Sequence, residues 1–347
     1  MAKGSWAGAI LGLAALGLAA PAAAQTRLFT DNSELPIIIE GPMNDLVRRA
    51  ARNTDAMPAT LTIDNHTFTI ELSPRGFSRR TLGICQFPPL RINLSGSRQG
   101  TIMQGQNKLK LVTRCRGGAS YEQLIVLEYL TYRLYNEITP LSFRVRPVRT
   151  TYRDPNSRRR EEVQFNFLIE DVDDLARRNL RRAIDVQSGE VPSSQLDPYQ
   201  ASIVGMFQYM IGNLDWDMVQ GSPGEECCHN GKLLAATANG RQDILPVPYD
   251  FDYSGFVSAP YAVPPQGAPV QNVRQRYYRG LCRFNDQVPA VAEHFRSRRD
   301  RLYAVIDGET RLTDGRRRQA RQYIESFFDV LDNPQRFERQ IIDNCRR

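Results

Sequence analysis

Alternation of apolar and polar residues is the main pattern in the first half of the chain. Stretches rich in Ile, Thr and Phe predict short strands at 36–40, 59–63, 67–72, 90–94 and 109–113. Two longer stretches, 143–151 and 163–169, predict a hairpin that turns at Asp154, Pro155 and Asn156. We therefore expect the N-terminal part of the protein to be mainly β.

Apolar residues repeat every three to four positions between 121 and 138, which predicts one long helix after the fifth strand. Ser120 and Gln123 form a capping-box pattern at its start. Further helices are expected at 172–183, 199–211, 289–306, 316–331 and 336–344, and short apolar strands are expected after Asn230 and at 244–248. The chain thus changes near residue 171 from a β-rich part to a mainly helical part.

The first 24 residues have the composition of a cleaved secretory signal. Lys3 precedes an apolar run at 7–19, and the small residues at 22–24 satisfy an Ala-x-Ala cleavage pattern. The apolar run is shorter than the roughly 20 residues that a helix spanning a bilayer needs. We expect a periplasmic or secreted protein that has no transmembrane segment once residues 1–24 are removed.

Six cysteines in an exported chain are expected to form disulfides, because compartments outside the cytoplasm are oxidising. Cys227 and Cys228 are neighbours, and the ring that a bond between them closes is strained. We therefore expect each of them to pair with a cysteine elsewhere. The alternative, a metal site built on Cys227, Cys228 and His229, lacks the spaced cysteine pairs of structural zinc sites.

The 347 residues carry a formal charge of +7, and only four of the 45 Lys and Arg residues are lysines. The 38 acidic residues are interspersed with the arginines, which indicates a mixed solvated surface and argues against a nucleic-acid partner. Loss of Lys3 with the signal leaves Lys108, Lys110 and Lys232. Because arginine is a poor substitute where a compact ammonium meets phosphate oxygens, these three lysines are candidates for phosphate binding.

Carboxylates and an amide follow apolar elements in the second half of the chain. Asp215 comes shortly after the helix predicted at 199–211, Asn230 precedes a short strand, and Asp250 and Asp252 follow another. In phosphoryl transfer from a nucleotide, one carboxylate orients the attacking hydroxyl, and Asn and Asp oxygens bind a divalent cation. We therefore assign Asp215 as the catalytic residue and Asp250, Asn230 and Asp252 as metal ligands. Taken singly, Asp and Asn in loops more often cap helices or close turns.

The phosphate-binding lysine is expected on the strand before the long helix. Lys108 and Lys110 lie on one face of this strand, so either could point inward, and Lys110 is favoured because apolar residues flank it. Glu128 lies on the inward apolar stripe of the helix and is expected to pair with Lys110, because a buried carboxylate needs a cation. The alternative is a partly exposed Glu128 paired with an arginine. Lys110, Lys108 and Glu128 are the candidate cofactor-binding residues.

Six motifs occur in order between residues 75 and 252. They are Arg75-Gly76-x-Ser78, Phe87-Pro88-Pro89-Leu90-Arg91, Lys108-Leu109-Lys110-Leu111-Val112, Phe167-Leu168-Ile169-Glu170-Asp171-Val172-Asp173, Gly212-Asn213-x-Asp215-Trp216 and Pro248-Tyr249-Asp250-Phe251-Asp252. This succession resembles the CotH family of spore-coat protein kinases and their bacterial relatives. The resemblance implies an enzyme that binds ATP with a divalent metal and phosphorylates Ser or Thr of exported proteins. Asp215 matches the catalytic aspartate of the family, and Asp250 matches the metal-binding aspartate.

The order of the predicted elements and the resemblance together imply an α+β, bilobal, protein-kinase-like fold. A β-rich N-terminal lobe would hold one long helix, and the C-terminal lobe would be mainly helical. The expected organisation is a signal peptide at 1–24, an N-terminal β extension at 25–80, an N-lobe at 81–171 and a helical C-lobe at 172–347. The chain has no recognisable glycine-rich phosphate loop, which makes Arg75, Arg79 and Arg91 further candidates for phosphate contacts.

Three functional hypotheses follow. The first is an exported CotH-like atypical kinase that transfers phosphate from ATP, with Mg²⁺ or Mn²⁺, to Ser or Thr of an envelope or secreted protein. The second is a catalytically inactive pseudokinase that acts as a binding module in the cell envelope. The third is a metal-dependent hydrolase built on Asp215, Asp217, Asp250 and Asp252, which is disfavoured because only His229 of the three histidines lies near them.

Overall fold

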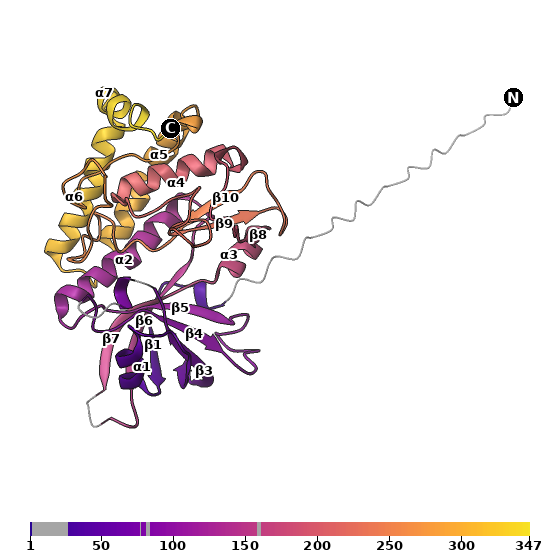
Figure 1. Ribbon diagram of the computed structural model, residues 1–347, viewed down its shortest axis with the longest axis vertical. Coiled ribbons are helices and arrows are strands. Elements are labelled where there is room, and N and C mark those ends of the chain that lie inside the picture. Colours follow the sequence, from indigo (N-terminus) through magenta and orange to yellow (C-terminus); the bar gives the residue numbers. More distant parts are fainter. Residues whose placement is uncertain (2–26, 77, 81–83, 158–160) are drawn as a thin grey trace.

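The computed structural model describes residues 1, 27–76, 78–80, 84–157 and 161–347. Apart from Met1, the signal peptide expected at 1–24 lies outside these residues. No described helix combines the length and the apolar character that crossing a membrane requires. Figure 1 shows a group of strands from the N-terminal half, with the helix α2 (Ala119–Ile138) between it and most of the C-terminal helices.

Seven strands of the described chain close into a barrel in the order β1-β2-β3-β4-β5-β7-β6. They are β1 (Leu35–Glu40), β2 (Met57–Ile63), β3 (His66–Pro74), β4 (Leu90–Leu94), β5 (Lys108–Val112), β6 (Val145–Arg153) and β7 (Glu162–Ile169). Neighbouring strands are antiparallel except β1 and β6, which run parallel. Alternate apolar residues such as Ile37, Ile39 and Leu61 fill the interior, as the two-residue period of a strand requires.

The expected bilobal kinase-like fold with a mainly helical C-terminal lobe is wrong. The N-terminal strands form a closed mixed barrel, and the C-terminal part contains a separate sheet as well as helices. The barrel closes because β1 pairs with β6, which brings Leu35 opposite Val148. The alternating pattern of a strand shows which of its faces is buried but carries no information about a partner that is far away in the sequence.

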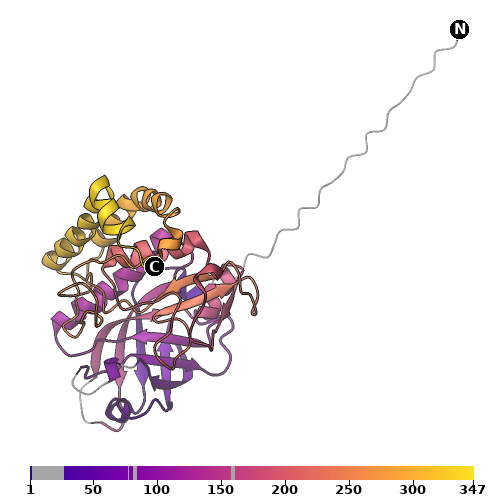
Figure 2. The ribbon, with the colours of Figure 1, turned by 45° about the horizontal axis from the view of Figure 1, so that its top comes forward.

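The second sheet has three antiparallel strands in the order β10-β9-β8. These are β8 (Arg182–Ile184), β9 (Gly231–Ala235) and β10 (Leu245–Pro248). The sheet packs against two helices, since β8 contacts α3 (Val172–Arg178) and β10 contacts α4 (Pro198–Ile211). Figure 2 shows this sheet beside the barrel. It was expected only in part, because β8 lies where the apolar pattern predicted the end of a helix.

The structure also contains further helical elements. They are α1 (Met43–Arg49), α5 (Val288–Asp307), α6 (Asp314–Leu331) and α7 (Pro334–Phe337), the 3-10 turns η1 (Arg27–Phe29), η2 (Ser78–Arg80), η3 (Ser193–Gln195) and η4 (Cys282–Phe284), and the π-helical turn η5 (Glu338–Ile342). The capping box predicted for α2 does not form. Gly118 is its N-cap residue, and the Gln123 side chain instead bonds to the backbone of Arg311 and Thr313.

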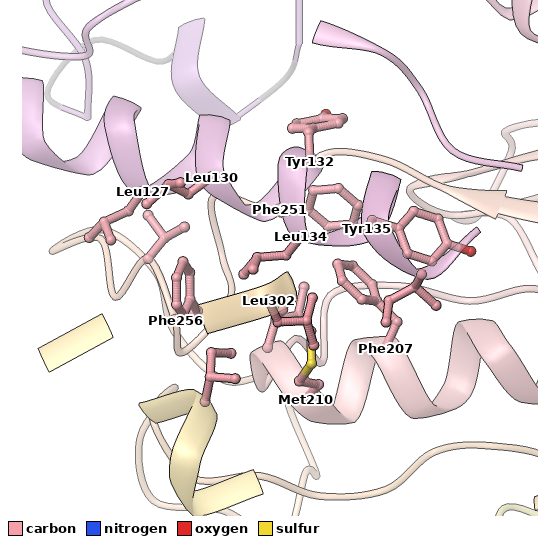
Figure 3. Close-up of a cluster of buried hydrophobic side chains, with 14 of the residues drawn as sticks. Leu127, Leu130, Tyr132, Leu134, Tyr135, Phe207, Met210, Phe251, Phe256 and Leu302 are labelled. Atoms are coloured by element: carbon pink, nitrogen blue, oxygen red, sulfur yellow. The ribbon is translucent and has the colours of Figure 1, made fainter. Parts of the chain in front are cut away.

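A continuous apolar core surrounds α2 and joins it to both parts of the molecule. Figure 3 shows where it meets Phe207 of α4 and Leu302 of α5. The ring centroid of Tyr132 lies 4.7 Å from that of Phe251, and the ring centroid of Tyr135 lies 4.3 Å from that of Phe207 in α4. Tyr132 also packs 5.6 Å from Phe167 of the barrel strand β7. Since burial of one large side chain contributes roughly 2–3 kcal/mol, these contacts fix α2 firmly between barrel and helices.

All six cysteines form disulfides, as expected, but one expected pairing pattern is wrong. The pairs are Cys85–Cys115, Cys282–Cys345 and Cys227–Cys228. The neighbouring cysteines bond to each other rather than to distant segments, with a cis peptide bond between them and their Cα atoms 3.0 Å apart. The other two bonds join segments that are 30 and 63 residues apart in the sequence.

Candidate functional site

The pairing of β9 with β10 brings two of the predicted site residues together. Gly231 lies opposite Pro248, so the residues just outside the sheet, Asn230 and Tyr249, also face each other. The backbone N–H of Tyr249 donates to the carbonyl of Asn230 at 3.0 Å. Asp250 follows directly, which places it beside Asn230 at the same end of the sheet.

The end of α4 positions Asp215. Gly212 terminates the helix in the left-handed conformation (φ 63°), which glycine adopts without steric cost. The side chain of Asn213 then accepts from the backbone N–H of Asp215 at 3.0 Å. The indole N–H of the buried Trp216 donates to the Asn213 carbonyl at 2.9 Å. The loop is therefore fixed on both sides of Asp215.

Asp215 is the centre of a hydrogen-bonded network. The side-chain amide of Asn230 donates to a carboxylate oxygen of Asp215 at 3.0 Å and to its backbone carbonyl at 2.7 Å. His229 Nε2 lies 2.7 Å from the other carboxylate oxygen, and His229 Nδ1 lies 2.9 Å from Ser222 Oγ. About a third of the His229 and Asp215 side chains is exposed, so solvent and solutes reach this network.

The hydrogen bond to Asp215 raises the pKa of His229 above its usual value of 6.5, against the opposing effect of partial burial. The charges of Asp215, Glu225 and Asp250 add to this upward shift. The protonated form of His229 is therefore favoured next to Asp215.

Asp250 has an unusual backbone and an unengaged carboxylate. Its φ of 65° is in the left-handed region, as is that of Asn230 at 50°, and a non-glycine residue there costs roughly 1–2 kcal/mol. The backbone N–H of Asp250 donates to the hydroxyl of Tyr132 in α2 at 3.0 Å. Its carboxylate forms no hydrogen bond or ion pair with the described residues, so both of its oxygens remain available to a ligand.

Lys110 reaches from the barrel toward the same place. Its ammonium lies 4.3 Å from the ring centroid of Tyr249 and 5.8 Å from that of Phe143. Burial and the charges of Arg75 and Lys232 together lower its pKa to about 7, against the opposing charges of Asp250 and Asp171. Lys108, the alternative on the same strand face, is exposed. The structure therefore supports Lys110 as the inward-pointing lysine.

Three cations gather here without carboxylate partners. Among the described residues, none of Arg75, Lys110 and Lys232 forms an ion pair, although each of the other two is close enough to shift the pKa of Lys110. Positive charges that lack ion-pair partners repel one another, and an anion bound between them would offset this repulsion. Arg91, the remaining candidate for a phosphate contact, is exposed on β4.

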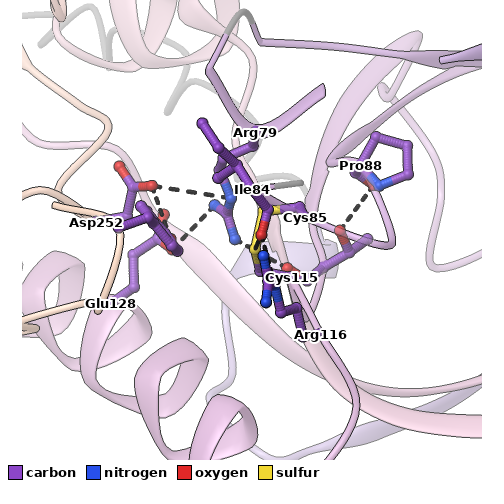
Figure 4. Close-up of a disulfide and its surroundings, with 10 residues drawn as sticks. Arg79, Ile84, Cys85, Pro88, Cys115, Arg116, Glu128 and Asp252 are labelled. Atoms are coloured by element: carbon purple, nitrogen blue, oxygen red, sulfur yellow. Dashed lines mark hydrogen bonds and ion pairs between the residues drawn. A yellow bond between two sulfur atoms is a disulfide. The ribbon is translucent and has the colours of Figure 1, made fainter. Parts of the chain in front are cut away.

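Glu128 is buried as expected but has a different partner (Figure 4). Arg79, which is only 5% exposed, lies 3.3 Å from Glu128 and 3.8 Å from Asp252. Tyr261 donates to the same Asp252 at 3.0 Å. No ion pair joins Glu128 to Lys110 among the described residues. Arg79 thus lies within ion-pair distance of both buried carboxylates, Glu128 and Asp252, and burial raises the pKa of each.

Two of the predicted metal ligands have the chemistry that a divalent cation requires. The Asp250 carboxylate and the side-chain oxygen of Asn230 are hard oxygen donors from adjacent positions, and Mg²⁺ is typically held by one or two such groups with phosphate oxygens and water. Asp252 is already engaged by Arg79 and Tyr261. Within the described chain, no group of three or more His, Cys, Asp or Glu side chains is arranged to hold a metal by itself.

Several residues of the site had no clear sequence signal. Ser222 lies in a loop of small residues, and only the folded loop places it against His229. Tyr132 is one of many apolar residues in α2, and its hydroxyl contact with Asp250 is invisible in the helical pattern. Arg79 belongs to a basic stretch at 75–80, where the sequence suggested a phosphate contact rather than a buried ion pair.

Asp217, proposed as part of a hydrolase site, has a structural role in this protein. Its carboxylate pairs with Arg346 near the C-terminus and lies 3.7 Å from Arg279. It also accepts from the backbone N–H groups of Val219 and Gln220. The remaining carboxylates of that hypothesis, Asp215, Asp250 and Asp252, are those described above.

Comparison with models of protein families finds none that matches the chain, and comparison with curated protein sequences finds no relative. A function is therefore inferred from the geometry and chemistry of the site.

Proposed function

We propose that this protein is an exported phosphotransferase that uses ATP and Mg²⁺ or Mn²⁺ to phosphorylate Ser or Thr hydroxyls of an envelope or secreted protein. One observation carries the proposal. A proton-accepting carboxylate (Asp215), two oxygen donors (Asp250 and Asn230) and an unpaired lysine (Lys110) from separate parts of the chain converge at one place. The motif resemblance to the CotH family points to the same chemistry.

Asp215 is the residue that orients the attacking hydroxyl and accepts its proton. Phosphoryl transfer needs positioning and electrostatic stabilisation more than covalent chemistry, and a carboxylate held on both sides satisfies the first need. The hydrogen bond that the Asp215 backbone N–H donates to Asn213 fixes the loop, and the bond that Asn230 donates to Asp215 fixes the carboxylate.

Lys110 and its neighbours supply the charge for the nucleotide phosphates. An ammonium whose pKa is lowered to about 7 by burial and by Arg75 and Lys232 gains strongly from a phosphate partner, because the anion offsets both the lost hydration and the repulsion. A divalent cation bound by Asp250 and Asn230 would neutralise the phosphate oxygens on the other side. The three disulfides support a periplasmic or secreted location, since such bonds persist in oxidising compartments.

The test is thermal unfolding with and without ATP and Mn²⁺. We expect the two together to raise the Tm of the parent protein and to have no effect on Asp250→Asn, which loses the charge but keeps a side chain that tolerates left-handed backbone. Asp243→Asn is the matched control, because Asp243 has a similar φ of 49° in an exposed turn. An equal rise in Tm for all three proteins would overturn the assignment of Asp250.

The alternative is a binding module without catalysis. Two outcomes separate it from the enzyme. Release of ADP that depends on Asp215 supports the phosphotransferase, and we expect Asp215→Asn to lower the rate by about 100-fold or more while the nucleotide-dependent Tm shift stays. If ATP and Mn²⁺ leave the Tm of the parent unchanged and no ADP forms, the binding module is the better description.

A further inference from the structure

A second charged site lies on another face of α2. Two adjoining cavities, of about 510 and 550 Å³, run along the groove between α2 and α5. They share Asn32, Arg133, Glu137 and Arg301 in their walls. Arg133 and Glu137 lie on a different helix face from Glu128 and Tyr132, which belong to the candidate phosphotransfer site.

Positive charge dominates the walls of this groove. The cavity of about 510 Å³ is lined by five arginines, namely Arg133, Arg144, Arg178, Arg298 and Arg301. Glu137 is the one carboxylate in the lining of that cavity. Arg178 is compensated by Glu170 at 2.9 Å. Among the described residues the other four arginines form no ion pair.

The surroundings of Arg298 and Arg144 also favour the binding of an anion. The Nε atom of Arg298 is buried and has no hydrogen-bond partner among the described residues. Partial burial and the nearby charge of Arg178 lower the pKa of Arg144, although Glu170 opposes the shift. The cost of holding four unpaired guanidinium groups around one groove disappears when an anion binds there.

The shape of the groove favours an extended ligand over a compact one. The charges are spread over α2, α5 and the segment before β6 rather than focused on one point. Apolar residues also line the groove, namely Phe29 and Val145 in one cavity and Leu130 and Val305 in the other. The side chain of Asn32 lies at the junction, where a backbone amide of a bound chain could meet it. An inorganic anion would use only a fraction of this lining.

We propose that the groove between α2 and α5 binds an acidic peptide segment of a partner protein. Guanidinium groups match carboxylates in paired hydrogen bonds, and the apolar walls accept the methylene groups of Glu side chains. The proposal does not depend on nucleotide chemistry, because none of the groove arginines belongs to the phosphotransfer site.

The test is fluorescence anisotropy with a labelled ten-residue peptide that alternates Glu and Ser, compared with the same peptide carrying Gln in place of Glu. We expect the parent protein to bind the Glu peptide, with an affinity that falls as salt increases, and not the Gln peptide. Arg298→Gln/Arg301→Gln should weaken binding about tenfold or more, because two charged contacts are lost.

The matched control is Arg316→Gln/Arg318→Gln in α6, which changes the net charge equally but lies outside the groove. We expect it to bind within about twofold of the parent. Arg133→Gln on α2 is a second groove variant, and it should also weaken binding even if the α5 double variant unfolds. Equal weakening by groove and control variants would overturn the proposal. So would binding of tripolyphosphate without binding of the Glu peptide, which would indicate a site for small anions.

Discussion

At the scale of single residues, His229 couples the candidate site to pH. Its pKa is raised by Asp215, so the folded state holds this proton more tightly than the unfolded state does. The stabilisation is therefore complete below the unfolded pKa of about 6.5 and is lost as the pH rises through the higher folded value. Between these limits the protein gives up part of the stability that the pair supplies.

We predict that His229→Gln lowers Tm more at about pH 5.5 than at about pH 9. These values lie about one unit below and about two to three units above the unfolded histidine pKa of about 6.5. The measurement is Tm as a function of pH for parent and variant. His66→Gln, at the exposed start of β3, is the control variant. A deficit for His229→Gln that grows with rising pH would contradict the sign.

Lys110 shows the opposite relation to stability. Burial and neighbouring cations lower its pKa to about 7, so charging it in the folded protein is unfavourable below its ordinary value of 10.5. We predict that Lys110→Met raises Tm at pH 6 to 7 (roughly at or below the shifted pKa) and removes the stabilisation by ATP and Mn²⁺. Lys108→Met, on the exposed part of the same strand, should change neither. A destabilised Lys110→Met that still responds to ATP would rule out this role.

At the scale of elements, the end of α4 is the most constrained turn near the site. A Cβ on Gly212 would lie 2.0 Å from the Tyr323 hydroxyl oxygen, and its φ is positive as well. We predict that Gly212→Ala lowers the free energy of unfolding by about 3 kcal/mol or more, because overpacking adds to backbone strain. Urea denaturation measures this loss.

Gly96→Ala separates the two causes. Gly96 has a φ of 78°, and no atom lies within 4 Å of the place that a Cβ would take, so only backbone strain opposes alanine there. The expected loss is about 1 kcal/mol. Similar losses at both glycines would mean that Tyr323 moves aside without cost.

Most strands and helices follow from local pattern, and the exceptions have physical causes. The strand predicted at 90–94 and the helix predicted at 199–211 agree with β4 and α4 to within a residue or so. The helix predicted from 172 ends at Arg178, because 182–184 pairs with β9 instead. Such pairing depends on tertiary contacts, which override the local preference of a short apolar segment.

The candidate site was also partly predictable from the local apolar pattern. Asp215, Asn230 and Asp250 each lie next to an apolar element whose end the pattern reveals, and the structure brings them together. The partner of Glu128 was not predictable, because the sequence offers many arginines, and only the fold places Arg79 beside it. Charge complementarity limits the type of partner but does not select one among many.

At the scale of the whole molecule, the bond between Cys282 and Cys345 attaches the C-terminal residues to η4. It closes a loop of 63 residues, so the unfolded chain without it has much more freedom. We predict that Cys282→Ala/Cys345→Ala lowers the free energy of unfolding by about 3–4 kcal/mol. The bond between Cys227 and Cys228 closes no long loop, so Cys227→Ala/Cys228→Ala should cost less by the same measurement. The reverse order of losses would contradict this explanation.

The closure of the barrel also sets an order of events in time. The strands β1 to β5 form a continuous antiparallel series. The two outer strands of this series, β1 and β5, gain their second partners only from the hairpin β6–β7, since β1 pairs with β6 and β5 pairs with β7. While the chain is made or threaded from its N-terminus, the open edges of β1 and β5 are exposed until Ile169 has emerged. The arrival of a single hairpin therefore covers both strand edges at once.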